Sequence, residues 1–187
     1  MSEFEVITIT LSFILGLGIT QILSGMVEVI RSPKREGLDW IPLVWAWVIF
    51  LQAMQIWFWM WADAQVREWT GLWYSAWVGL ASLLFLAGGL ILPNRISAEG
   101  ESLGQYFERT GRQALTALSS FMVLAAVVNS FTAGPFTLSN ILLYVLTLIV
   151  VTVTVSRKRP VRAVGTILYM VILMLGLAFV WAAPGRG

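Results

Sequence analysis

The chain has 187 residues, of which 58% are hydrophobic and only 12% are charged. A soluble globular domain has about 45–50% apolar and about 25% charged residues, so this composition is hard to reconcile with a solvated surface. The chain also contains no cysteine and no histidine. This absence excludes disulfides, thiolate nucleophiles, histidine-ligated zinc or haem, and catalytic dyads or triads that use a histidine base.

Six apolar runs are each long enough to cross the hydrocarbon core of a bilayer, which is about 30 Å thick. They cover residues 6–30, 40–62, 72–92, 113–132, 136–156 and 161–182. Prolines mark the breaks between most of the runs, because proline cannot continue the interior of a helix. The pattern predicts an all-α polytopic membrane protein, with residues 1–187 forming a single membrane domain of six transmembrane helices.

Lysine and arginine are distributed unevenly among the connections. Ten of them lie between runs one and two, three and four, or five and six, counting Arg162 at the very start of run six, whereas only Arg67 and Arg186 belong to the other side. Loops rich in these residues stay in the cytoplasm, so we expect both termini outside and residues 93–112 in a cytoplasmic loop. Pairing of the basic loops with anionic lipid headgroups explains the net charge of +2, and no nucleic-acid partner is needed.

The cytoplasmic loop itself contains a short helical pattern before the fourth run. Apolar or small residues recur there at helical spacing, at Leu103, Tyr106, Phe107 and Thr110. The pattern favours a helical extension at the membrane interface that leads into the fourth span. A docking surface for a cytoplasmic partner is the alternative.

Tryptophan is concentrated in one part of the chain, where nine of the ten residues lie between positions 40 and 77. Two sets have a spacing of four residues, so each set lies along one helix face at the outer interface. One interpretation is an aromatic belt at the headgroup level. The other is an outer vestibule for an organic cation or a planar apolar solute. Its walls would be formed by Trp57, Trp61, Trp69, Trp73 and Trp77, with Asp63 between them.

Several polar side chains lie within the predicted spans, and the candidates for a pathway or for interhelical bonds are Gln21, Glu28, Gln52, Gln55 and Asn129. At 1.5 Å per residue, Gln21 and Gln52 reach similar heights in antiparallel spans. Polar groups at this depth either form hydrogen bonds between helices or line a path, so a polar track from Glu28 to Asn129 is the alternative to interhelical pairing. A local ion pair with Arg31, three residues later, or snorkelling of the side chain to the interface explains Glu28, and a carboxylate that binds a proton or cation is the other possibility.

The first span has a small or polar residue at every fourth position, namely Thr8, Ser12, Gly16, Thr20 and Ser24. Small side chains at this spacing let another helix approach closely. This stripe predicts a crossing helix, either from the same chain or from a second copy in a homo-oligomer.

Two segments resemble a known group of proteins. They are Phe13-Ile-Leu-Gly-Leu-Gly-Ile-Thr-Gln-Ile-Leu-Ser-Gly25 and Tyr106-Phe107-Glu108-Arg109. Both are similar to segments of uncharacterised bacterial six-span inner-membrane proteins. The resemblance covers most of the chain and implies a multi-pass protein of the bacterial inner membrane, but it supplies no mechanism.

The remaining function classes are few. The sequence has no glycine-rich phosphate loop, no acidic cluster for a metal, and no lysine at membrane depth, so we expect neither an enzyme nor a bound cofactor. We expect a channel or transporter protomer for a small solute or ion, which the tryptophan sets and the level of Gln21 and Gln52 favour. The alternative is a non-transporting scaffold, sensor or accessory subunit that associates with membrane lipids and with another membrane protein.

Overall fold

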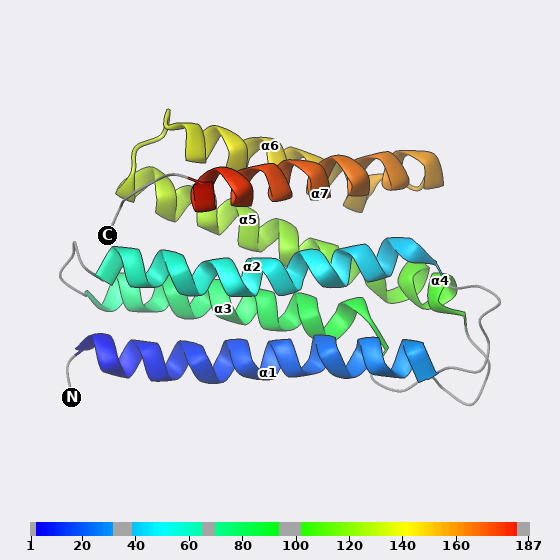
Figure 1. The fold of residues 1–187 in the computed structure, drawn as a ribbon, viewed down its shortest axis with the longest axis horizontal. Helices are drawn as coiled ribbons and strands as arrows, with labels where there is room; N and C mark the ends of the chain where they lie inside the picture. The colour runs from blue at the N-terminus through cyan, green and yellow to red at the C-terminus, as the bar shows by residue number, and fades with distance from the viewer. Residues whose placement is uncertain (1–2, 32–38, 65–69, 94–101, 183–187) are drawn as a thin grey trace. The chain divides into compact units, whose positions relative to one another are not determined.

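The computed structural model describes residues 3–31, 39–64, 70–93 and 102–182 (Figure 1). Within these ranges, six helices are long and apolar enough to cross a membrane, and no residue is in a strand. The predicted all-α architecture with six potential spans is therefore confirmed for the described residues.

The elements in chain order are α1 (Glu3–Arg31), α2 (Trp40–Ala64), α3 (Gly71–Ile91), α4 (Leu103–Tyr106), η1 (Phe107–Gly111), α5 (Arg112–Thr132), α6 (Leu138–Val155) and α7 (Arg159–Ala182). The η1 element is a π-helical turn that joins α4 to α5. Residues 103–132 thus form one helical run, and the helical extension expected before the fourth span is present.

The chain divides into two compact units, residues 1–121 and 122–187, with the boundary inside α5. That residues 1–187 form a single membrane domain stays a prediction. In the first unit, α3 packs against both α1 and α2, and its contact with α1 is the most extensive (Figure 1). In the second unit, α6 and α7 pack side by side.

Glycines allow α1 and α3 to approach closely. A Cβ added at Gly25 of α1 would lie 2.7 Å from the Cβ of Leu92, and one added at Gly18 would lie 3.3 Å from the Cα of Phe85. From the other helix, a Cβ at Gly88 would lie 3.0 Å from the Ile22 side chain. Such close approach increases van der Waals contact between helices, which is a main source of their association in lipid.

This contact face is not the stripe predicted from the sequence. Ser12, Gly16, Thr20 and Ser24 are all exposed, and a Cβ at Gly16 would meet no atom within 4 Å. The hydroxyls of Ser12 and Thr20 donate to carbonyls of their own helix, four residues back, at 2.6 and 2.8 Å. Within the first unit, the buried face of α1 uses Leu11, Gly18, Ile22 and Gly25 instead. Contact of the stripe with another helix of the same chain stays a prediction. Contact with a second copy stays a prediction.

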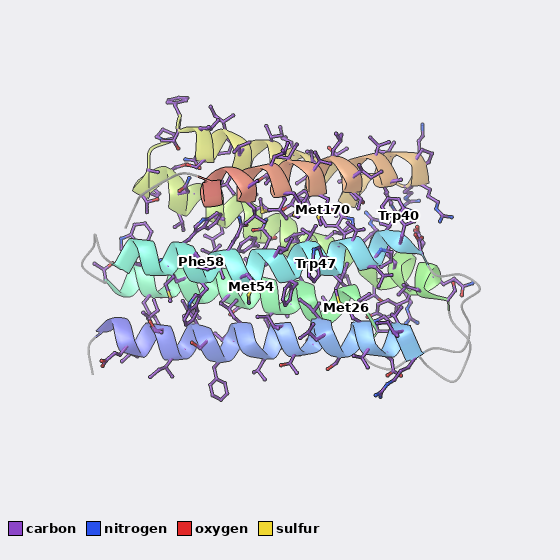
Figure 2. The ribbon with its side chains drawn as sticks, in the orientation of Figure 1. Met26, Trp40, Trp47, Met54, Phe58 and Met170 are labelled. Atoms are coloured by element: carbon purple, nitrogen blue, oxygen red, sulfur yellow. The ribbon has the colours of Figure 1, made fainter. Side chains whose placement is uncertain are left out.

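Large side chains follow one another along the exposed part of α2. Trp40, Trp47, Met54 and Phe58 lie along this helix in Figure 2, and each is exposed. Trp47 also stacks on Phe50, with ring centroids 5.2 Å apart. Spacings of seven and four residues place these side chains on one side of α2.

The α7 helix buries a face that contains polar groups. Arg162, Thr166 and Tyr169 are buried, at intervals of four and three residues. The Nε of Arg162 donates to the carbonyl of Ser156 at 2.8 Å, and the Tyr169 hydroxyl donates to the Sδ of Met122 at 3.4 Å. These bonds tie α7 to the α6–α7 connection and to the last part of α5.

We expect Gly25→Ala to lower the free energy of unfolding in detergent by about 1–3 kcal/mol, the usual cost of overpacking. The Leu92 Cβ cannot move away without shifting the backbone of the chain at the end of α3. Gly176→Ala is the matched control, since an added Cβ there meets no atom within 4 Å and alanine is the better helix former. Thermal unfolding followed by circular dichroism measures both, and equal melting temperatures would contradict the glycine contact.

Candidate functional site

The largest set of polar side chains in hydrogen-bonding contact within the second unit joins the end of α5 to the start of α6. Asn140 lies at its centre and is fully buried. Its Nδ2 donates to the carbonyl of Gly134 at 2.8 Å and to the Oγ of Ser130 at 3.0 Å, and its Oδ1 accepts from Asn129 Nδ2 at 3.1 Å. Both amide protons and the amide oxygen are thus used inside the hairpin.

The turn between the two helices is built around this asparagine. Gly134 has a φ of +96°, a left-handed conformation that favours glycine. Thr137 caps the N-terminus of α6, because its Oγ1 accepts from the backbone N–H of Asn140 at 3.4 Å. The conformation of Gly134, the cap at Thr137 and the side-chain bonds of Asn140 therefore all stabilise the same turn.

Ser130 and Tyr144 complete this network. Ser130 Oγ donates to the carbonyl of Ala126 at 2.7 Å, and it lies 3.1 Å from the Tyr144 hydroxyl. Because the single proton of Ser130 is used on Ala126, the Tyr144 hydroxyl is the donor in the second bond. These bonds hold the end of α5 to the start of α6.

The sequence analysis identified Asn129 but missed Asn140. Asn129 does bond across to α6, through Ser139 Oγ at 3.3 Å as well as through Asn140. A signal for Asn140 was present, because it stands three residues after Thr137 in the first turn of the helix. Asn140 was missed because it lies inside the apolar run 136–156.

The glutamines of the first unit have different surroundings. Gln52 is 2% exposed, and Ile49, Ala53 and Ile56 beside it on α2 are also buried. Gln21 is half-buried and its amide lies against Gly89 of α3, where any larger residue would collide with its Oε1. Gln55 is half-buried. No hydrogen bond joins Gln21 to Gln52 in the described part of the chain, so their similar height does not produce a pair.

Glu28 is half-buried near the end of α1. Among the described residues, no ion pair joins it to Arg31, so the expected local pair is not formed. The polar track proposed from Glu28 to Asn129 would link residues of both units. It stays a prediction.

The tryptophans of the predicted outer vestibule differ in exposure. Trp57 is 38% exposed and Trp73 is half-buried, but Trp77 is only 3% exposed. The Nε1 of Trp77 has no hydrogen-bond partner in the described part of the structure. Trp77 is therefore a packing residue of α3 and does not line an open vestibule. The side chains of Trp61 and Asp63, and the whole of Trp69, lie outside the described residues.

The segment Tyr106–Arg109, which carries part of the family resemblance, closes the end of α3. The Tyr106 hydroxyl lies 3.4 Å from the carbonyls of both Leu90 and Leu92, which α3 leaves without helical partners. The Arg109 guanidinium lies 5.9 Å from the centre of the Tyr106 ring. Phe107 is buried and its ring lies against Gly111. The segment thus fixes the start of α5 to the first unit.

In the described ranges, no group of three or more acidic, cysteine or histidine residues is placed so that it could hold a metal ion. Comparison of the chain with protein-family models, with curated proteins and with solved structures gives no match. The function must therefore be argued from the chain's own geometry.

Replacing Asn140 with leucine is expected to lower the free energy of unfolding by about 1–3 kcal/mol, because the substitution leaves the Gly134 carbonyl and Asn129 without buried partners. Ser139→Ala removes the contacts of Ser139 Oγ with Asn129 and Thr137 at an exposed position and should cost less than about 1 kcal/mol. Thermal unfolding in the same detergent compares the two variants. Equal losses would show that Asn140 is not the centre of the network.

Proposed function

We propose that this protein is a non-transporting membrane subunit, a scaffold or accessory component that associates with other membrane chains through α1. The observation that carries the proposal is the burial of polar side chains inside the helical units. Asn140 is fully buried with its amide bonded inside the hairpin, and Gln52 is 2% exposed among apolar side chains. A transported solute needs polar groups that water reaches, whereas Asn140 acts as an internal contact and Gln52 is buried among apolar side chains.

The exposed side of α1 supports association with another chain. Ser12, Gly16, Thr20 and Ser24 are small and exposed along a helix whose opposite face is buried on α3. With the Ser12 and Thr20 hydroxyl protons bonded to their own helix, a second helix could approach without leaving these donors unpaired. A homo-oligomer is the simplest such assembly.

A channel or transporter protomer is the second candidate. It is favoured by the same stripe, because the exposed serine and threonine oxygens keep lone pairs that could face water or an ion at the axis of an oligomer. The exposed Trp57 and Trp59 of α2 would then remain available for an aromatic outer vestibule.

The proposal includes a location in the bacterial inner membrane with both termini outside. Its support is the ten-to-two distribution of lysine and arginine between the two sides, together with the family resemblance. No catalytic role and no cofactor are proposed.

Extraction into native nanodiscs, followed by mass measurement, tests the assembly. We expect a particle heavier than one 20.8 kDa chain, and we expect Gly16→Ile with Thr20→Ile to reduce it to a single chain by preventing close approach. Leu23→Ile, an apolar exchange at an exposed position of α1, should leave the mass unchanged.

Flux measurements separate the two candidates. Liposomes that contain the purified wild-type protein should pass small ions and neutral solutes no faster than empty liposomes. A flux that the Gly16→Ile and Thr20→Ile variant abolishes would favour the pore at the oligomer axis. A single-chain mass in the wild type would contradict self-association through α1.

A further inference from the structure

An apolar groove lies along α6 and α7 within the second unit. Its volume is about 450 Å³, within the range of about 300–1,000 Å³ that is typical of ligand sites. Leu148 of α6 and Val164 and Leu168 of α7 contribute to its walls, and all three are exposed. The one polar side chain in the lining, Thr152, donates its proton to the carbonyl of Leu148 at 2.7 Å. The walls thus suit a hydrocarbon chain.

One end of the groove reaches the basic connection between the two helices. Pro160 and Val161 line the groove, and they directly follow Arg157, Lys158 and Arg159 in the chain. Arg157 and Lys158 are exposed. The N-terminus of α7, which begins at Arg159, adds a partial positive charge at the same end.

The backbone of this connection is fixed by its own contacts. The buried Arg162 donates from Nε to the carbonyl of Ser156 at 2.8 Å, and its backbone N–H donates to the carbonyl of Lys158 at 3.1 Å. The N–H of Lys158 in turn donates to Ser156 Oγ at 3.3 Å. The backbone that carries the two exposed cations, adjacent in the chain to Pro160 and Val161 of the groove, is therefore held in an ordered turn.

We propose that this groove binds an anionic phospholipid. An acyl chain lies between α6 and α7, and the headgroup phosphate lies at Arg157 and Lys158. A zwitterionic lipid would fill the groove equally well with its acyl chain but would gain less from the cations. Selectivity for the anionic headgroup is therefore the property that distinguishes a site from general contact with the bilayer.

Native mass spectrometry with equimolar phosphatidylglycerol and phosphatidylcholine of identical acyl chains tests the site on the full-length protein. The wild type should retain phosphatidylglycerol preferentially. Arg157→Gln with Lys158→Gln should lower the ratio of the two bound lipids about tenfold or more. Arg31→Gln with Arg112→Gln is the charge-matched control at two other exposed positions, and it should change the ratio less than about twofold. Equal effects of the two double variants would overturn the proposal.

The groove is tested separately from the charges. Val164→Trp fills it and should reduce the amount of both bound lipids at least about fivefold, whereas Val171→Trp, at an exposed position of α7 outside the groove, should not. Leu168→Trp is a second groove-filling variant in case the first fails to fold. Retention of phosphatidylglycerol by both groove-filling variants would overturn the proposal.

Discussion

Close approach between α1 and α3 is the constraint on which the first unit depends. Apolar side chains gain nothing by leaving lipid for another apolar surface, so helices in a bilayer associate through close van der Waals contact and a few hydrogen bonds. Gly18 and Gly25 provide that contact from α1, and Gly88 and Gly89 provide it from α3. The half-buried Gln21 also depends on it, because its amide occupies the space that a side chain at Gly89 would need.

The same constraint explains where the polar groups lie. With little water at membrane depth, a polar side chain is stabilised by a partner within the protein. Ser12, Thr20 and Thr152 use carbonyls of their own helices, and Asn140 uses the hairpin turn. Polar residues used in this way stabilise a bundle without opening a path through it. This internal use of polar groups is the physical basis for the proposal that the chain is a non-transporting membrane subunit.

The sequence predicted the spans well but not the helix faces. Span positions depend on local composition, so all six apolar runs correspond to helices. Rotation about a helix axis depends on the partner, and α1 carries small residues on two faces. The spacing of four at Ser12, Gly16 and Thr20 was conspicuous, yet α3 packs against Gly18 and Gly25, which are seven residues apart.

In the candidate site, the predicted depth of a residue in the membrane likewise did not predict its contacts. Similar heights for Gln21 and Gln52 were compatible with a pair, but height does not determine the direction of a side chain. Asn140 was missed because an apolar run surrounds it, and its burial depends on a turn that begins at Gly134. The lipid groove depends on the pairing of α6 with α7, which composition does not predict.

Water accessibility of position 52 tests the central claim most directly. Because the chain has no cysteine, a Gln52→Cys variant carries a single reactive thiol. A membrane-impermeant maleimide is applied to each side of sealed vesicles, with Ser102→Cys in the loop as the positive control. The account predicts that Ser102→Cys reacts from one side only and that Gln52→Cys reacts from neither side until the protein is denatured. Rapid labelling of the folded Gln52→Cys variant would contradict the account, since it would require a water-filled path to the middle of α2.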